Sequence, residues 1–324
     1  MKPYASLSLD LDNAWSYLKT RNDDSWKTFP SYLDQVVPDV MRLLDRHGLT
    51  MTFFIVGRDA ALPANQSMMK LMGESRHEIG NHSYEHEPWI TGRSTADIAA
   101  EIELAQQTIE TATGRKPSGF RSPGYALAPS LLDALSSLGF LYDASSLPTC
   151  IGPLARAYYF ATAKLTPEER EQRAALFGSV RDAFRPLKPY MIQTACCPLL
   201  EIPVTTFPGI RLPIHFSYIL YLAQHSELIA MTYFRSAMLA CLAGNVRPSL
   251  LLHPLDFLVA DDYPSLGFFP AMHMARDYKR RILDATLKIY STHFDIVSTG
   301  DHASRAIDEL QNPSVPVFPI RRTN

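Results

Sequence analysis

The chain of 324 residues has few cysteines and almost no net charge. Its four cysteines include no Cys-x-x-Cys pair, and the adjacent Cys196 and Cys197 are poorly suited to ordinary disulfide geometry. We therefore expect reduced thiols. The formal net charge of −2 gives no overall basic excess of the kind that binds nucleic acid or an anionic membrane. The composition thus predicts no nucleic-acid partner.

Long apolar runs are also missing. The most apolar region, residues 212–243, is interrupted by histidines, a glutamate and an arginine, so it falls short of the roughly 18 uncharged residues that a membrane-spanning helix needs. We expect a buried pair of helices there; the alternative is an apolar wall, or a membrane-facing surface, for a lipid-linked substrate. The first residues lead directly into a strand-like segment and lack an apolar signal core, which predicts a cytoplasmic protein.

The chain does contain a regular alternation of strand-like and helix-like segments. Apolar residues make up 46% of the sequence and charged residues 20%, values typical of a globular protein with a sizeable core. Ser94 has the character of a helix N-cap, and Gly114 ends the same amphipathic segment. The expected strands cover residues 5–11, 50–56, 77–81, 118–121, 140–144, 199–204, 249–253 and 294–298. The expected helices cover residues 31–47, 65–73, 94–113, 129–138 and 271–293.

About eight strands that alternate with helices over this length are typical of a single (β/α) barrel. Residues 148–198 interrupt the alternation with a charged helix that opens near Thr166 and with Pro- and aromatic-rich loops that reach Tyr190. The sequence therefore predicts an α/β fold, an irregular (β/α) barrel of seven or eight parallel strands. It forms one domain over residues 1–324, with an insertion at the barrel mouth at 148–198 and an apolar helical region at 212–243.

The most informative motif is His82-Ser-Tyr-Glu-His86, which follows an expected strand. Imidazole is the commonest side-chain metal ligand, and a pair four residues apart can aim two ring nitrogens at one point if the segment turns helically. Other polar residues follow the ends of other expected strands: Asp10 and Asp12, Arg121, Asp143 and His253. Because catalytic residues of (β/α) barrels collect at the C-terminal ends of strands, these residues predict one metal-dependent hydrolase site.

These motifs carry a resemblance to a known family. Asp-x-Asp at residues 10–12, His-Ser-x-x-His at 82–86, Arg-Ser-Pro-Gly at 121–124 and Leu-Leu-His-Pro at 251–254 resemble, in order and spacing, the polysaccharide deacetylases of carbohydrate esterase family 4. The resemblance covers roughly residues 5–145 and resumes at about 199–298. The first motif departs from the family's usual Thr-Phe-Asp-Asp-Gly. It is similar to an Asp-x-Asp branch that includes intracellular-type and amide-cleaving members.

The resemblance implies a metal site and a catalytic base. Asp12, His82 and His86 would ligate a divalent metal ion and leave positions open for water and a substrate oxygen. Zn²⁺ is the first expectation, and Co²⁺ and Ni²⁺ are alternatives that the same donor set accepts. Asp10, beside the metal, would be the general base that takes a proton from the attacking water.

The resemblance also implies groups that support the base and complete the reaction. Arg121 would hold the base by a charge-assisted hydrogen bond, and the backbone N–H of Tyr125 would stabilise the oxyanion. His253 would be the general acid that protonates the departing amine. Its charge would be supported by Asp143 or by Asp256, of which Asp143 is preferred because it matches the family's fourth motif.

Taken together, the resemblance predicts metal-dependent hydrolysis of an N-acyl group, N-acetyl first, from an amino sugar. An oligosaccharide, a nucleotide-linked sugar and a lipid-linked glycan are all open as substrates. One alternative is an amidohydrolase or deformylase that acts on a different C–N substrate. Another is a non-catalytic carbohydrate-binding protein on the same fold. The sequence predicts neither the oligomeric state nor the acceptor sugar.

Overall fold

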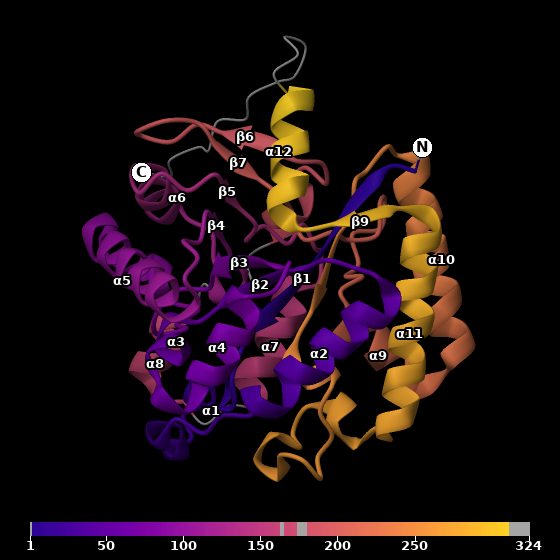
Figure 1. Ribbon diagram of the computed structural model, residues 1–324, viewed down its shortest axis with the longest axis horizontal. Helices are drawn as coiled ribbons and strands as arrows, with labels where there is room; N and C mark the ends of the chain where they lie inside the picture. The colour runs from indigo at the N-terminus through magenta and orange to yellow at the C-terminus, as the bar shows by residue number, and fades with distance from the viewer. Residues whose placement is uncertain (1, 163–164, 174–179, 311–324) are drawn as a thin grey trace.

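A single curled sheet organises the protein, whose computed structural model describes residues 2–162, 165–173 and 180–310 (Figure 1). The strand order is β6-β7-β5-β4-β3-β2-β1-β8, with β9 also paired to β1. All pairs are parallel except β6 with β7. The strands are β1 Tyr4–Leu11, β2 Thr52–Ile55, β3 Glu78–Asn81, β4 Gly119–Phe120, β5 Tyr142–Asp143, β6 Tyr190–Ile192, β7 Leu199–Glu201, β8 Ser249–Leu252 and β9 Asp295–Val297.

Helices surround this sheet, with α5 on one side of the molecule and α10 and α11 on the other (Figure 1). The helices are α1 Ala14–Thr20, α2 Leu33–His47, α3 Gly57–Ala61, α4 Gln66–Gly73, α5 Thr95–Thr113, α6 Pro129–Ser137, α7 Gly152–Thr162, α8 Pro167–Gln172, α9 Phe216–His225, α10 Glu227–Ala243, α11 Arg276–His293 and α12 Thr299–Leu310. The predicted α/β barrel class is confirmed, with a sheet that curls rather than closes by strand pairing. Between β7 and β8 the described residues meet through two hydrogen bonds, Thr205 N to Ser249 O at 3.2 Å and Ser249 N to Thr205 Oγ1 at 2.7 Å.

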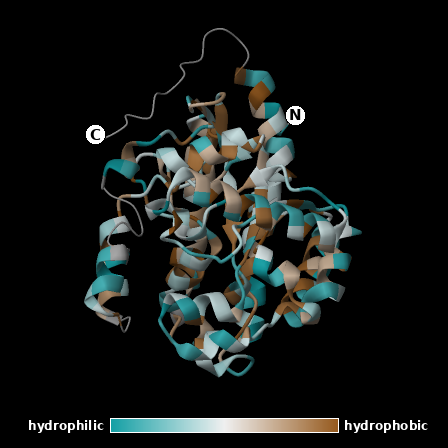
Figure 2. Cartoon of the chain, turned by 90° about the vertical axis from the view of Figure 1, so that its left-hand side faces the viewer, coloured by the Kyte–Doolittle hydropathy of each residue, from teal (hydrophilic) through white to brown (hydrophobic). Residues whose placement is uncertain are grey.

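Strand β1 shows how the sequence builds the barrel wall. All eight of its residues are buried, and its leucines belong to the core cluster that the outer helices share. Side chains on a strand alternate between its two faces, so the intervening Ser6, Ser8 and Asp10 point into the barrel. These buried polar groups have partners there, as in the 2.9 Å contact between Ser6 Oγ and His302 Nδ1. Figure 2 shows this contrast, with strongly apolar strands inside and helices of mixed polarity outside.

Two helices that border the barrel were not predicted from the sequence. α1 begins directly after β1, where the Asn13 side chain accepts a hydrogen bond from the Ala14 N–H and caps it. α12 lies at the end of the barrel where the strands begin, and the Gly300 N–H at its first turn donates to Glu78 at 2.7 Å. The seven residues of α1 are too few for a clear helical period, and α12 follows the last strand without a linker.

The insertion differs from expectation at its end. α8 begins where predicted, with Thr166 forming a capping box with Glu169, and α7 precedes it. Tyr190, predicted in a loop, instead begins β6, an antiparallel edge strand on β7. A three-residue strand carries too little alternation to be visible in the sequence. The predicted late helix also begins five residues late, because Pro270–His273 form a separate 3₁₀ turn before α11.

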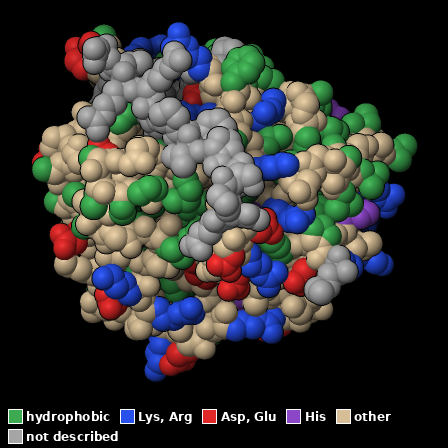
Figure 3. Space-filling view, turned by 90° about the horizontal axis from the view of Figure 1, so that it is seen from above, with side chains coloured by type: hydrophobic (Ala, Val, Ile, Leu, Met, Phe, Trp, Pro, Cys, Tyr) green, Lys and Arg blue, Asp and Glu red, His purple; other side chains and the backbone are tan. Residues whose placement is uncertain are grey.

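The apolar region 212–243 forms the predicted pair of helices, α9 and α10, whose inner faces join the main core. Among the described residues, the helices are all too short or too polar to cross a membrane. On the face seen from above in Figure 3, basic and acidic side chains are interspersed.

Candidate metal centre and active site

Asp12, His82 and His86 converge at the C-terminal ends of β1 and β3. His82 Nε2 lies 3.1 Å and His86 Nε2 lies 2.8 Å from the same oxygen, Asp12 Oδ1. The ligand atoms of all three residues lie within 4.8 Å of one another, and all three side chains are buried. Among the described residues this is the group of three whose geometry suits a metal ion.

A tight turn, rather than the expected helical turn, brings the two histidines together. Ser83 and His86 both have left-handed backbone angles, with φ of 62° and 49°. The Asn81 side chain accepts a hydrogen bond from Ser83 N–H at 2.9 Å, and Ser83 Oγ accepts one from His86 N–H at 3.2 Å. These local hydrogen bonds offset the cost of the unusual backbone angles and fix the ring positions.

The second nitrogen of His82 determines which nitrogen faces the cluster. Its Nδ1 lies 2.7 Å from the carbonyl oxygen of Arg121, which only accepts hydrogen bonds. Nδ1 therefore carries the hydrogen, and the Nε2 lone pair is directed at the point that Asp12 faces. Burial disfavours the charged His82 ring, but the negative charges of Asp10 and Asp12 outweigh it and raise its pKa. The two carboxylates thus place negative charge beside the His82 ring, which favours a positive charge at this position.

Two imidazoles and one carboxylate form a donor set that fits a catalytic divalent metal with positions left for other ligands. Burial opposes the ionised form of Asp12, yet the two histidines lower its pKa well below its usual value, so the carboxylate is ready to ligate. His86 Nδ1 is buried and has no hydrogen-bond partner among the described residues. The residues present therefore fit the metal that the family resemblance implies.

Asp10 is held beside this cluster by Arg121. Arg121 Nη1 donates to Asp10 Oδ1 and to Ser8 Oγ, each at 2.8 Å, and its Nε donates to Ala144 O at 2.8 Å. Its guanidinium also lies over the Phe54 ring at 4.3 Å. Arg121 is fully buried, so the ion pair is little screened by water and fixes the orientation of the Asp10 carboxylate.

His253, at the end of β8, is linked to Asp256 rather than to Asp143. Ser217 Oγ lies 3.2 Å from His253 Nδ1 and donates to Asp256 Oδ1 at 2.7 Å. Asp256 Oδ2 accepts the His253 backbone N–H at 2.8 Å. The preference for Asp143 as the carboxylate partner of His253 is therefore wrong, and the alternative that the sequence left open is the one that the structure places there.

Asp143 has a different position in the barrel. It lies at the end of β5, where Ser145 Oγ donates to its Oδ1 at 2.6 Å and where the buried Glu201 on β7 lies beside it. Burial, followed by the negative charge of Asp143, raises the pKa of Glu201 well above its usual value, so Glu201 keeps its proton. Asp143 is thus paired with a neutral acid inside the sheet, which explains its separation from His253.

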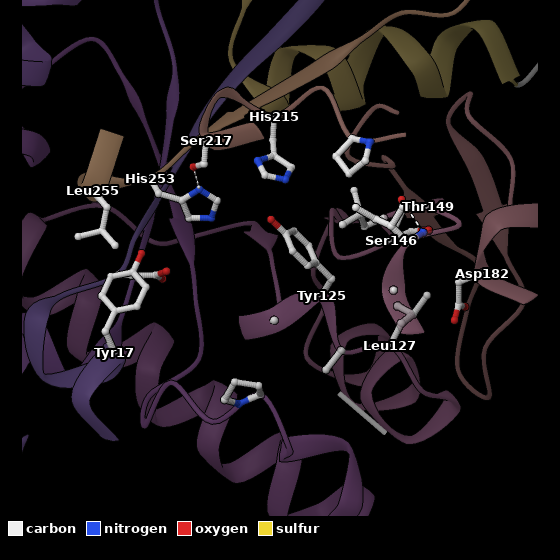
Figure 4. Close-up of a pocket in the computed structure, with 18 of the residues that line it drawn as sticks. Tyr17, Tyr125, Leu127, Ser146, Thr149, Asp182, His215, Ser217, His253 and Leu255 are labelled. Atoms are coloured by element: carbon white, nitrogen blue, oxygen red, sulfur yellow. Dashed lines mark hydrogen bonds between the residues drawn. The ribbon is translucent and has the colours of Figure 1, made fainter. Parts of the chain in front are cut away.

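Tyr125 also differs from its predicted role. Its backbone N–H donates to Ser122 O at 3.2 Å and closes a short 3₁₀ turn, so this group is already used within the protein. Both Gly124 and Tyr125 have left-handed backbone angles, with φ of 62° and 59°. That geometry directs the Tyr125 side chain into the pocket (Figure 4). Burial, followed by the charge of Asp10, raises the pKa of this phenol, which stays neutral.

These residues surround a pocket of about 610 Å³ (Figure 4). Asp12 lines it together with His253, and apolar residues such as Leu127 and Leu255 form much of the wall. His253 and Tyr17 lie on one side of the close-up, and Asp182 from the insertion lies on the other. The pocket is therefore bounded by the strand ends and by the insertion together.

Three pocket residues were missed or given another role by sequence reasoning. Tyr17 lies on α1, and burial followed by the charge of Asp12 raises its pKa well above the usual value. His215 is the N-cap of α9 and Ser217 lies in its first turn, and the His215 ring lies 6.1 Å from the His253 ring. Burial and the charge of His253 lower the pKa of His215 to about 3, so this ring is neutral. The position of Tyr17 one turn after the Asp-x-Asp motif was the only sequence signal for these residues.

Comparison with known proteins gives a consistent result. A sequence profile of the family described as polysaccharide deacetylase matches residues 19–142. The peptidoglycan-N-acetylglucosamine deacetylase of Listeria monocytogenes is 33% identical over 88 residues, which cover 27% of this chain and 18% of that protein. The peptidoglycan deacetylase of Helicobacter pylori is 30% identical over 112 residues, which cover 34% of this chain and 36% of that protein. The matches thus span less than half the length of either relative.

Solved structures extend the fold comparison to the whole chain. A Mycobacterium smegmatis protein described as a polysaccharide deacetylase has a TM-score of 0.64 at 16% identity, covering 100% of this chain and 95% of that one. A Pseudomonas aeruginosa protein with the same description has a TM-score of 0.58 at 16% identity, covering 97% and 92%. The matched stretch includes His82, His86 and Arg121, so the part of this chain that carries these residues is similar to the polysaccharide deacetylase family.

Proposed function

We propose that this protein hydrolyses an N-acyl group, N-acetyl first, from an amino sugar, with a divalent metal bound by Asp12, His82 and His86. The observation that supports this most directly is the convergence of the three buried side chains on one point, of which Asp12 lines the pocket that His253 also lines. Asp10, oriented by Arg121 at 2.8 Å, adds a carboxylate that does not belong to the ligand set. The proposed ligands, base and acid therefore come from different strand ends, and Asp12 and His253 among them line one pocket.

The division of labour follows from the contacts of each side chain. Once bound, the metal lowers the pKa of a water molecule and polarises the acyl carbonyl. Asp10 accepts the proton of the attacking water, and the hydrogen bond from Arg121 fixes the orientation of its carboxylate. His253 donates a proton to the departing amine nitrogen, and Asp256 supports its charge through Ser217. Two proton transfers are thus assigned to groups held by separate hydrogen-bond networks.

Metal content provides the test. The purified chain is dialysed against Zn²⁺, Co²⁺ and Ni²⁺ in turn, and bound metal is measured by plasma mass spectrometry. We expect a single bound ion in the wild type and its loss in His82→Ala. His77→Asn, which changes a buried histidine outside the cluster, is the matched control and should bind metal normally. A wild type without bound divalent metal, or a His82→Ala variant that keeps it, contradicts the proposal.

The substrate is proposed to be an oligosaccharide, a nucleotide-linked amino sugar or a lipid-linked glycan, encountered in the cytoplasm. Support comes from the pocket, because its wall is formed by apolar residues together with residues of the insertion. Released acetate should be highest with one of these three substrate types and low with long chitin chains. Equal release from long chitin would contradict this assignment.

A second candidate is an amidohydrolase or deformylase on a non-carbohydrate amide. The apolar part of the pocket wall favours it, because small-molecule sites are usually lined mainly by apolar side chains. Measuring acetate, formate and ammonia separately distinguishes the candidates. Formate or ammonia without acetate would support the second candidate, and catalytic turnover of any substrate would exclude a purely carbohydrate-binding role.

A further inference from the structure

Large apolar side chains are exposed around the pocket on segments far apart in the sequence. Phe184 is 82% exposed, Leu154 71%, Ile210 52% and Tyr221 48%. Tyr221 itself lines the pocket. A single exposed apolar side chain is normal in a soluble protein, whereas a contiguous patch of them indicates an interaction surface. We call these four residues the apolar rim.

Direct contacts join the segments that carry the apolar rim. Cys150 N–H donates to Arg211 O at 3.2 Å, and the Cys150 thiol lies 3.6 Å from Ile210 O. Arg211 Nη1 in turn donates to Arg185 O at 3.0 Å, one residue after Phe184. Thr149 and Arg185, which flank these contacts, both line the pocket. Phe184 and Ile210 therefore lie on segments that this hydrogen bond joins, next to residues that line the pocket.

The same contacts place Leu154 and Tyr221 in that surface. Leu154 lies in the first turn of α7, where its N–H donates to Ile151 O at 3.0 Å, and Ile151 lines the pocket. Tyr221 stacks on Tyr218 with ring centroids 6.2 Å apart. Tyr221 and Ile151 line the same pocket, which places α9 and the loop before α7 on its wall. The rim thus comprises one surface that four segments build.

The charge of these segments differs from that of the chain as a whole. Residues 146–162 and 203–225 contain no Asp or Glu and one arginine each, Arg156 and Arg211. Residues 180–193 contain Arg181, Arg185 and Lys188 against Asp182 alone. The rim segments therefore carry five basic residues and one acidic residue, whereas the chain has a net charge of −2. The overall charge conceals a local basic excess at the pocket mouth.

We propose that the apolar rim docks on an anionic lipid surface and turns the pocket mouth toward the headgroups. Exposed apolar side chains insert at the boundary between headgroups and acyl chains, and adjacent Lys and Arg residues are attracted to anionic lipids. Arg181 and Lys188 are exposed beside Phe184, in the position that this mode of binding requires. A protein partner or a second copy of this chain would call for no basic excess, so the lipid surface is the occupant that both features favour.

The docking has a consequence for the substrate that rests on the proposed function. A pocket held against a lipid surface admits an N-acyl amino sugar whose anchor stays in the membrane, and the apolar wall adjoins that anchor. Of the three substrate types proposed above, docking selects the lipid-linked glycan. The docking itself involves no metal and no hydrolysis, so it is tested separately.

Vesicle sedimentation tests the docking. The full chain is mixed with vesicles of phosphatidylglycerol and phosphatidylcholine, or of phosphatidylcholine alone, and the bound fraction is measured after centrifugation. We expect binding to the anionic vesicles that falls at least tenfold in the triple variant Leu154→Ser, Phe184→Ser, Ile210→Ser. The matched control is Leu71→Ser, Leu104→Ser, which removes exposed leucines from α4 and α5 and should bind as the wild type does.

Three results would overturn the docking proposal: no binding of the wild type to anionic vesicles, an equal loss in the control variant, or a wild-type dimer in ultracentrifugation that the triple variant abolishes. Circular dichroism verifies that both variants are folded. The Asp10→Asn variant, assayed in parallel, should bind vesicles normally even though the proposed activity is lost. Failure of docking therefore leaves the proposed hydrolysis standing, and failure of hydrolysis leaves the docking standing.

Discussion

The two ends of the barrel hold buried polar groups of the same kinds but pair them differently. At the end that α12 covers, Glu78 Oε2 accepts hydrogen bonds from Thr52 Oγ1 at 2.5 Å and from Gly300 N–H at 2.7 Å, and Tyr142 O–H donates to Oε1 at 3.1 Å. At the other end, Asp12 Oδ1 faces two imidazole nitrogens and the pocket. Burial of a carboxylate is common to both ends.

The two ends differ in whether the oxygens of the buried carboxylate remain available to bind a ligand. The covered end satisfies its carboxylate with neutral donors from the protein, which stabilises the fold and leaves nothing for a ligand. At the open end, the Asp12 carboxylate and the two imidazole nitrogens direct their lone pairs at one point. This arrangement becomes stabilising only when a cation binds. A buried polar cluster is therefore a candidate site only when its groups converge on a pocket.

The largest expected effect is a loss of catalytic activity when a carboxylate at the open end is changed, but not when one at the covered end is changed. Asp10→Asn removes the proposed base while preserving the shape of the side chain, and we expect turnover to fall by about 10³-fold. Metal content should stay at the wild-type level, because Asp10 is not a ligand. The steady-state rate on the preferred substrate and plasma mass spectrometry measure the two quantities.

The matched control for Asp10 is Glu78→Gln at the covered end. This variant should lose about 1–3 kcal/mol of stability, because it weakens hydrogen bonds to a buried carboxylate. Its turnover per folded molecule should remain that of the wild type. Equal activity losses in the two variants would show that burial alone, and not position at the open end, makes a carboxylate important.

The second prediction concerns the fully buried Arg121. Arg121→Met leaves Asp10 buried without its partner, and we expect a loss of about 3–5 kcal/mol in the free energy of unfolding. Arg115→Met is the control, since Arg115 is only half-buried and contacts backbone carbonyls. Urea unfolding followed by circular dichroism measures both. A similar loss in both variants would argue against a special role of the Asp10 ion pair.

The third prediction compares the two carboxylates considered for His253. Asp256→Asn removes the negative charge that supports His253 through Ser217, and we expect a loss of about 1.5–3 kcal/mol in transition-state stabilisation, or roughly 10–100-fold in kcat/KM. Asp143→Asn should reduce kcat/KM less, since Asp143 pairs with Glu201 inside the sheet. A larger loss in Asp143→Asn would restore the assignment that the sequence motif favoured.

The smallest effect is a pH dependence at the covered end. Burial, followed by the charges of Arg247 and Arg305, lowers the pKa of His302 from its ordinary 6.5 to about 3. Between these two pH values the imidazole of His302 is protonated in the unfolded chain but not in the folded chain. The free energy of unfolding therefore falls as the pH decreases from about 6.5 toward about 3. The slope contributed by this histidine is at most about 1.4 kcal/mol per pH unit.

His302→Asn tests this slope. The variant loses the ring that contacts Ser6 Oγ, so it should be less stable than the wild type at neutral pH. Between pH 6 and about pH 4, however, its urea midpoint should decline less steeply than that of the wild type, because no imidazole remains to be protonated. An unchanged pH dependence would mean that other buried groups dominate acid unfolding.

The predictable part of this protein lies where the signal is local. The strand and helix boundaries mostly agree with expectation, because β1 and α5 carry enough residues to show their period and caps. The ligand set was also visible, since His82 and His86 share one turn and Asp12 follows a strand. Short elements such as β6 and α1 escaped detection because three to seven residues carry too little periodicity.

The sequence by itself determined which residue types stand at the strand ends, and through them the family resemblance and the candidate ligands. Only the tertiary structure decided that Asp256 reaches His253, because the bridging Ser217 is 36 residues from His253 and lies on another element. It likewise decided that the Tyr125 N–H is used internally and that exposed apolar residues lie on separate segments that each contribute to the pocket wall. These outcomes depend on which segments pack together, and contacts between distant segments produce no periodic pattern in the sequence.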